Sequence, residues 1–60
     1  MAKILVIEDD NKIRSILKEI LTEKDHDVDE AADGAEGLKK LTQHVYDLCL
    51  CDIKMPKMDG

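Results

Sequence analysis

Carboxylate side chains follow two apolar runs of this 60-residue chain. Glu8, Asp9 and Asp10 come directly after Ile4–Ile7, and Asp52 comes directly after a second apolar run. Mg²⁺ typically takes one or two carboxylates, water and phosphate oxygens as its ligands. A carboxylate beside such an ion can attack phosphorus while the metal neutralises the phosphoryl oxygens. We therefore expect phosphoryl transfer, with Asp52, which stands alone at its strand end, as the nucleophile.

Taken singly, each of these acidic residues also has a plainer interpretation. Asp10 is in the right place to cap a helix, since carboxylates accept hydrogen bonds from the first free N–H groups. Asp33 and Asp59 belong to turns, and His26 and His44 are expected to face solvent. The grouping favours a cation, because packed carboxylates without one repel each other and at least one pKa must rise.

Two helices and three strands must position these residues. Short apolar runs rich in β-branched residues predict strands over Lys3–Ile7 and Val45–Cys51, and a weaker strand covers Asp27–Ala32. Helical spacing marks two apolar stripes between the strands, one formed by Ile13, Ile16, Leu17, Ile20 and Leu21, the other by Ala35, Leu38 and Leu41. The alternation strand–helix–strand–helix–strand predicts an α/β fold with parallel strands and helical crossovers.

The order of the strands decides whether the carboxylates meet. In the order 2-1-3, the first and third strands are neighbours, and their carboxyl ends share one edge of the sheet. Ligands of open α/β sheets bind beyond the carboxyl ends of strands, where the strand order switches. We expect Glu8, Asp9 and Asp52 to come within reach of one ion there.

Composition narrows the function class. The net charge of −5 and the pI of about 4.8 argue against a nucleic-acid surface in this segment. There is no apolar run of membrane-spanning length and no signal peptide at the start, so we expect a cytoplasmic protein with no membrane contact. Cys49 and Cys51 are expected to be small, reduced core residues. A C-x-C metal site is the weaker alternative, because no second cysteine pair accompanies them.

Three segments resemble the receiver domains of bacterial response regulators. Ile4–Asp10 followed by Ile13-Arg14 is similar to the start of that family, and Ala32–Leu38 is similar to its junction between second strand and second helix. Tyr46-Asp47-Leu48 with Asp52–Gly60 resembles its phosphoacceptor segment. The resemblance implies a truncated flavodoxin-like receiver fold, with residues 1–60 as the N-terminal half of one receiver domain.

The resemblance also implies roles for named residues. Asp52 would accept a phosphoryl group from the histidine of a sensor histidine kinase. Asp9 would bind Mg²⁺ directly, Glu8 through water, and the backbone carbonyl of Lys54 would be a further ligand. Glu8 stands where the family more usually has Asp. The module would be regulatory, not a turnover enzyme.

Two residues of the receiver family are missing from this chain, and their absence leaves other functions open. The later strands of such receivers carry a hydroxyl residue and a lysine at the phosphoryl group, and this chain lacks both segments; Lys54 and Lys57 lie in the wrong loop to replace that lysine. The alternative is a truncated, self-associating structural fragment that binds metal at most. A phosphohydrolase with an aspartate nucleophile is disfavoured, because Lys54 stands where its second Asp would be.

The strand over Val45–Cys51 is also expected to mediate self-association. It would be a central strand in a whole receiver, but here its outer edge has no neighbour and both faces are apolar. An exposed apolar edge is a template for pairing. We expect a homodimer in which this strand pairs with its own copy, antiparallel about a two-fold axis.

Overall fold

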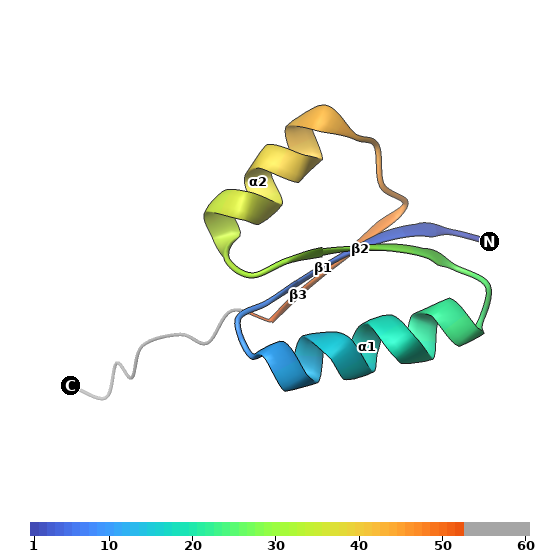
Figure 1. The fold of residues 1–60 in the computed structure, drawn as a ribbon. Helices are drawn as coiled ribbons and strands as arrows, with labels where there is room; N and C mark the ends of the chain where they lie inside the picture. Colours follow the sequence, from blue (N-terminus) through green and yellow to red (C-terminus); the bar gives the residue numbers. More distant parts are fainter. Residues whose placement is uncertain (53–60) are drawn as a thin grey trace.

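The computed structural model describes residues 1–52, with Asp52 described by its backbone alone. Five elements follow one another along this part of the chain (Figure 1). They are β1 (Lys3–Glu8), α1 (Asn11–Glu23), β2 (Asp27–Ala31), α2 (Gly34–Gln43) and β3 (Leu48–Asp52).

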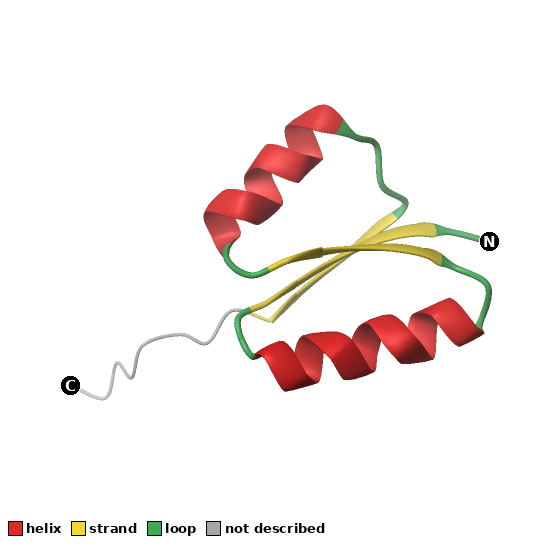
Figure 2. Ribbon diagram, viewed as in Figure 1, coloured by secondary structure: helices red, strands yellow, loops and turns green. Residues whose placement is uncertain are grey.

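The three strands form one parallel sheet in the order β2-β1-β3. Helix α1 covers one face of the sheet and α2 covers the other, so the molecule has three layers (Figure 2). The predicted α/β class, element order, parallel pairing and 2-1-3 strand order are therefore confirmed.

Strand β1 forms the centre of the core. Its residues Ile4 to Glu8 are all buried, because β1 has a strand on each side and a helix layer on each face. The pleat divides the core into two clusters, since successive side chains point to opposite faces. On the α1 face lie Ile4, Val6 and Val28 with Leu17, Leu21 and Leu50; on the α2 face lie Leu5, Ile7 and Ala31 with Tyr46.

Helix α1 begins and ends with backbone groups that are satisfied locally. The Oδ1 atom of Asp10 accepts hydrogen bonds from the amides of Lys12 (2.9 Å) and Ile13 (3.2 Å), which confirms Asp10 as the N-cap. At the other end, the amides of Asp25 and His26 donate to the carbonyls of Thr22 and Leu21. This is the Schellman pattern, with Asp25 in the left-handed region at φ 66° where glycine is usual.

The apolar stripe of α1 is only partly used in packing. Leu17 and Leu21 reach the core, but Ile13, Ile16 and Ile20 remain 40%, 54% and 46% exposed. The cause is the position of α1, which contacts β1 and β2 and does not contact β3. Part of the stripe therefore has no sheet beneath it in residues 1–52.

Helix α2 packs through a glycine. Asp33 is its N-cap and accepts from the amide of Glu36 at 2.8 Å, while the Glu36 carboxylate accepts from the amide of Ala32 at 3.0 Å. Gly37 is buried directly against the side chain of Ile7. Leu38, predicted on the apolar stripe, is 63% exposed, because the closest approach of helix and sheet runs through Gly37 instead.

The third strand differs from its predicted bounds. It begins at Leu48 instead of Val45 and extends to Asp52. Just before it, Asp47 is hydrogen-bonded to β1 through its side chain as well as its backbone. The Asp47 carboxylate accepts from the amide of Lys3 at 2.8 Å, and the Asp47 amide donates to the Lys3 carbonyl at 2.7 Å.

The predicted burial of the two cysteines is wrong. Cys49 and Cys51 are free thiols, as expected, but both are exposed. They align with Leu5 and Ile7 of β1, which places them on the face that carries α2. Helix α2 contacts β1 and β2 but not β3, so nothing in residues 1–52 covers this part of the sheet. No helix in that range is long and apolar enough to cross a membrane.

Candidate functional site

The two carboxylate-bearing strand ends meet at one edge of the sheet. Strand β1 ends at Glu8 and β3 ends at Asp52, and these two residues are direct partners in the parallel register. Because the strands are hydrogen-bonded neighbours, their Cα atoms lie about 5 Å apart. The expected juxtaposition therefore exists at the level of the backbone.

Glu8 is buried, with 1% of its surface exposed. One oxygen of its carboxylate, Oε2, accepts a hydrogen bond from the amide of Asp10 at 2.9 Å. The side chain thus turns back and holds the turn between β1 and α1. This inward placement and its bond to the backbone give Glu8 a structural part in the loop in addition to any contact with an ion.

Asp9 is the exposed member of the acidic group, whereas Asp10 is committed to capping α1. Only Asp9 among the three therefore presents its carboxylate to solvent beyond the sheet edge. The direct contact of Asp9 with a metal ion and the water-mediated contact of Glu8 stay predictions.

The remaining predicted site groups lie outside the described residues. These are the carboxylate of Asp52 and the backbone carbonyl of Lys54. Among the side chains that the structure describes, no three of His, Cys, Asp or Glu gather as ligands of a metal ion. The oxygen donors of Glu8 and Asp9 still fit a hard divalent cation in their chemistry, since such ions take carboxylate oxygens.

An arginine to which the sequence analysis assigned no role, Arg14, contacts this edge of the sheet. Arg14 donates from Nη1 to the backbone carbonyl of Glu8 at 2.7 Å, and its Nη2 donates to the side-chain oxygen of Asn11. Its Nε lies 3.4 Å from a carboxylate oxygen of Glu30 on β2. The signal in the sequence was its position one turn into α1, because helical side chains lean toward the N-terminus and so toward the end of β1.

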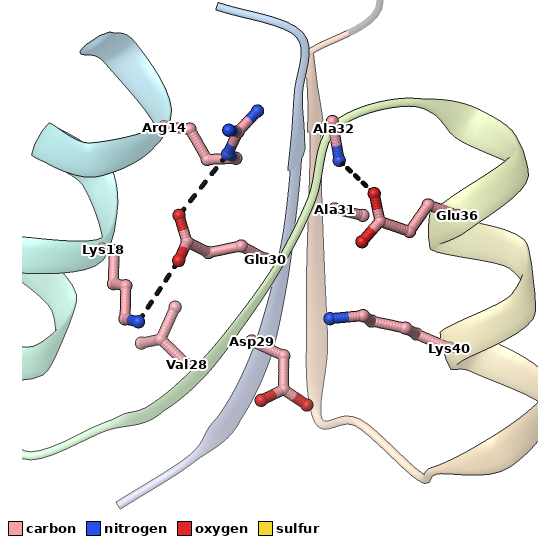
Figure 3. A pocket seen from close by; sticks show the side chains of 9 residues that line it. All are labelled: Arg14, Lys18, Val28, Asp29, Glu30, Ala31, Ala32, Glu36 and Lys40. Atoms are coloured by element: carbon pink, nitrogen blue, oxygen red, sulfur yellow. Dashed lines mark hydrogen bonds and ion pairs between the residues drawn. The ribbon is translucent and has the colours of Figure 1, made fainter. Parts of the chain in front are cut away.

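The Glu30 carboxylate forms ion pairs with two cationic side chains of α1. Lys18 lies 3.2 Å from the second oxygen of the Glu30 carboxylate, so the carboxylate bridges Arg14 and Lys18 (Figure 3). These groups line one side of a hollow of about 370 Å³ across β2, and Glu36 and Lys40 of α2 line the other side. The hollow has mixed charge and lies beside β2, not at the ends of β1 and β3.

A second polar contact missed from the sequence lies on the α2 face. The hydroxyl of Tyr46 donates to Oδ2 of Asp29 at 2.5 Å, and the ammonium of Lys3 lies 5.5 Å from the centre of the tyrosine ring. Burial, with the hydrogen bond to Asp29, raises the pKa of Tyr46 to about 12. The same hydrogen bond lowers the pKa of Asp29 below its usual value. No periodicity of the sequence marks this pair, which forms only when the chain folds.

Comparison with known proteins gives one consistent family. The family model described as "Response regulator receiver domain" matches residues 4–60. A "Probable transcriptional regulator ycf27" of Cyanidium caldarium is 44% identical over 57 residues, which are 95% of this chain and 23% of that protein. "Response regulator ArlR" of Staphylococcus aureus (strain Mu50) is 37% identical over 60 residues, which are 100% of this chain and 27% of that protein. The chain thus spans about a quarter of the length of these relatives.

Proposed function

We propose, because this chain belongs to the family of response regulator receiver domains, that it is a phosphoacceptor module of two-component signalling in which Asp52 receives the phosphoryl group. The observation that supports this best is the register of the sheet, which pairs Glu8 with Asp52 at the carboxyl ends of adjacent strands. The family match includes both strand ends and the segment that follows.

The donor is proposed to be a phosphohistidine of a sensor histidine kinase. A carboxylate oxygen of Asp52 attacks phosphorus, the phosphorus–nitrogen bond to the histidine breaks, and the electron pair returns to the imidazole ring, which takes up a proton. The product is an acyl phosphate on Asp52. Transfer of this kind leaves the chain modified, so the module regulates and does not turn over substrate as an enzyme does.

Four groups of the chain are proposed to hold Mg²⁺: the carboxylates of Glu8, Asp9 and Asp52 and the backbone carbonyl of Lys54. The ion supplies neutralisation of the negative phosphoryl oxygens. Asp9 is suited to direct contact because it is exposed, and Glu8 to contact through water because its carboxylate already secures the amide of Asp10. The buried Glu8 also fixes the direction in which the loop presents Asp9.

Location and output follow from the same assignment. We propose a cytoplasmic chain whose segment 1–60 contacts neither nucleic acid nor membrane, in keeping with its net charge of −5. The name of the Cyanidium relative includes transcriptional regulation. We propose that this receiver also serves the regulation of transcription, through parts of a protein beyond these residues.

Labelling with a small phosphodonor tests the phosphoacceptor role. Acetyl phosphate with Mg²⁺ is expected to add the mass of one phosphoryl group to the chain, and Asp52→Asn is expected to abolish the addition. Asp33→Asn is the matched control, because it removes one carboxylate at the N-cap of α2 while asparagine still caps the helix. Labelling that persists in Asp52→Asn, or disappears in Asp33→Asn, would contradict the assignment.

A second function rests on the outer edge of β3. Strand β3 ends the strand order, and within residues 1–52 no strand pairs with its outer side. Leu48, the first residue of β3, is 50% exposed, and Val45, shortly before the strand, is 87% exposed. The alternative is thus a self-associating structural fragment that binds metal at most, and either function is compatible with a homodimer through this edge.

Sedimentation and labelling together separate the two functions. A dimer that carries no label after the phosphodonor treatment supports the fragment. Leu48 and Leu50 point to the same face of β3, but Leu50 packs against the core, whereas Leu48 is half exposed. Leu48→Lys therefore places a charge on the outer strand with less disturbance of the core than a change at Leu50. The lysine variant is expected to be monomeric, and a dimer that survives it would argue against pairing through β3.

A further inference from the structure

The contacts of Arg14 extend from the acidic loop to the far edge of the sheet. Its Nη1 holds the backbone carbonyl of Glu8, the last residue of β1, at 2.7 Å. Its backbone amide donates to the carbonyl of Asp10 at 2.9 Å. One residue therefore engages both ends of the turn that presents Asp9.

The guanidinium is itself held in place from the opposite side. Glu30 on β2 lies 3.4 Å from Nε, and the side chain of Arg14 is only 17% exposed. Asn11 accepts from Nη2. Since the guanidinium is planar and has five N–H donors, it can serve all three partners at once, whereas a lysine ammonium has no such fork.

The orientation of Asp9 depends on these contacts. Asp9 has a neighbour on each side that is tied down: Glu8 by its carbonyl to Arg14, and Asp10 by its amide to the Glu8 carboxylate at 2.9 Å. Without the guanidinium, the end of β1 loses one of these two attachments. The backbone around Asp9 then samples more conformations, and a metal ligand there is less well preorganised.

We propose that Arg14 is a positioning residue of the candidate metal site, acting through the Glu8 carbonyl and anchored by Glu30. The effect on metal binding, the metal half of the proposal, rests on the proposed function. The effect of Arg14 on the conformation of the loop, the positioning half, can be measured without any ion.

Hydrogen exchange of the chain without metal tests the positioning half. In Arg14→Lys, exchange of the Asp10 amide, divided by that of the Leu5 amide in the same sample, is expected to rise about tenfold, the equivalent of one lost hydrogen bond to a charged group. The division by Leu5 removes any change in global stability. Lys18→Gln is the control, since Lys18 touches Glu30 but not the loop, and its ratio is expected to stay within about twofold of the wild type.

A titration with Mg²⁺, followed by the Asp9 and Asp10 amide resonances, tests the metal half. The dissociation constant is expected to rise about tenfold in Arg14→Lys, the usual effect of losing a group that orients a ligand, and to be unchanged in Lys18→Gln. If a lysine at position 14 does not restore Mg²⁺ binding, then the forked donors of the guanidinium are required, and a positive charge alone is not enough. An exchange ratio for Arg14→Lys within about twofold of the wild type would overturn the proposal.

The possible results distinguish the metal site from the role of Arg14 in the loop. A wild-type chain that binds no Mg²⁺, with a raised exchange ratio in Arg14→Lys, refutes the metal site and keeps the role of Arg14 in the loop. Binding of Mg²⁺ that is equal in the wild type and in Arg14→Lys supports the metal site and overturns the positioning role. A raised ratio with weakened binding supports both.

Discussion

Replacing Gly37 by alanine should destabilise the chain, although alanine is the better helix former. The added Cβ would lie 2.3 Å from Cδ1 and 2.8 Å from Cγ1 of Ile7, far inside the 3.5 to 4.0 Å at which carbon atoms pack. Ile7 is 7% exposed and belongs to the core cluster on the α2 face, so it has little space into which to move. Overpacking of this kind costs about 1 to 3 kcal/mol.

The helix propensity of alanine offsets about 1 kcal/mol of that cost. The net expectation for Gly37→Ala is a free energy of unfolding lower by about 1 kcal/mol, within a range from about 0 to 2. A loss of this size is serious for a 60-residue chain, whose core is small. Urea unfolding followed by far-ultraviolet circular dichroism measures it, at one fixed protein concentration because a dimer would make stability depend on concentration.

Gly34→Ala supplies the matched control. Gly34 is the first residue of the same helix, but a Cβ there meets nothing within 4 Å. The same substitution is therefore expected to raise the free energy of unfolding, by up to about 1 kcal/mol. Ile7→Val removes the nearest clashing atom, so the double variant with Gly37→Ala should lose less than the sum of the two single changes. A Gly37→Ala chain as stable as Gly34→Ala would refute the close-contact argument.

Three further changes are expected to have defined effects. Tyr46→Phe should lower the free energy of unfolding by about 1 kcal/mol near neutral pH, because Asp29 loses its hydrogen-bond donor, and urea unfolding would measure the loss. The pKa of Asp29 is lowered, so the wild type should lose this stabilisation as pH falls below 3.8. The pKa of Tyr46 is raised, so the wild type should also lose stability as pH rises from 10 to about 12. A Tyr46→Phe chain whose stability still fell in both pH ranges would contradict the pairing. Asp25→Gly should raise the melting temperature, because glycine adopts the φ of 66° without the steric cost that an L side chain pays, and a lower melting temperature would count against the Schellman assignment. Asp33→Ala should lower the free energy of unfolding by about 1 kcal/mol through loss of the α2 cap, and equal urea midpoints for Asp33→Ala and Asp33→Asn would argue that the cap contributes nothing.

Much of the fold follows from local patterns in the sequence. The apolar run Ile4–Ile7 predicted a strand, and Asp10 was recognised as a helix cap. The alternation of elements predicted parallel pairing, and the 2-1-3 order then placed the ends of β1 and β3 together. Each of these inferences depends on residues close in sequence or on a topological rule.

The differences arise where distant residues decide the structure. The run from Val45 has strand propensity, but the strand begins only at Leu48, after Asp47, whose side chain accepts from the amide of Lys3, 44 positions earlier. Cys49 is exposed because neither helix contacts β3, and no periodicity encodes how far a helix extends across a sheet. The inward turn of Glu8 was likewise hidden, because a carboxylate after a strand reads as a solvent-facing loop residue.

The central position of β1 also orders the events of folding. It precedes both of its partners in the sequence: β2 lies on one side, and on the other lies β3, whose contacts with β1 span 44 positions along the chain. Contacts of long sequence separation form late, because their loop entropy must be overcome before they stabilise anything. We therefore expect β1, α1 and β2 to associate first, with one flank of β1 bare until β3 arrives. The edge where Glu8 meets Asp52 is then the last part of the sheet to assemble.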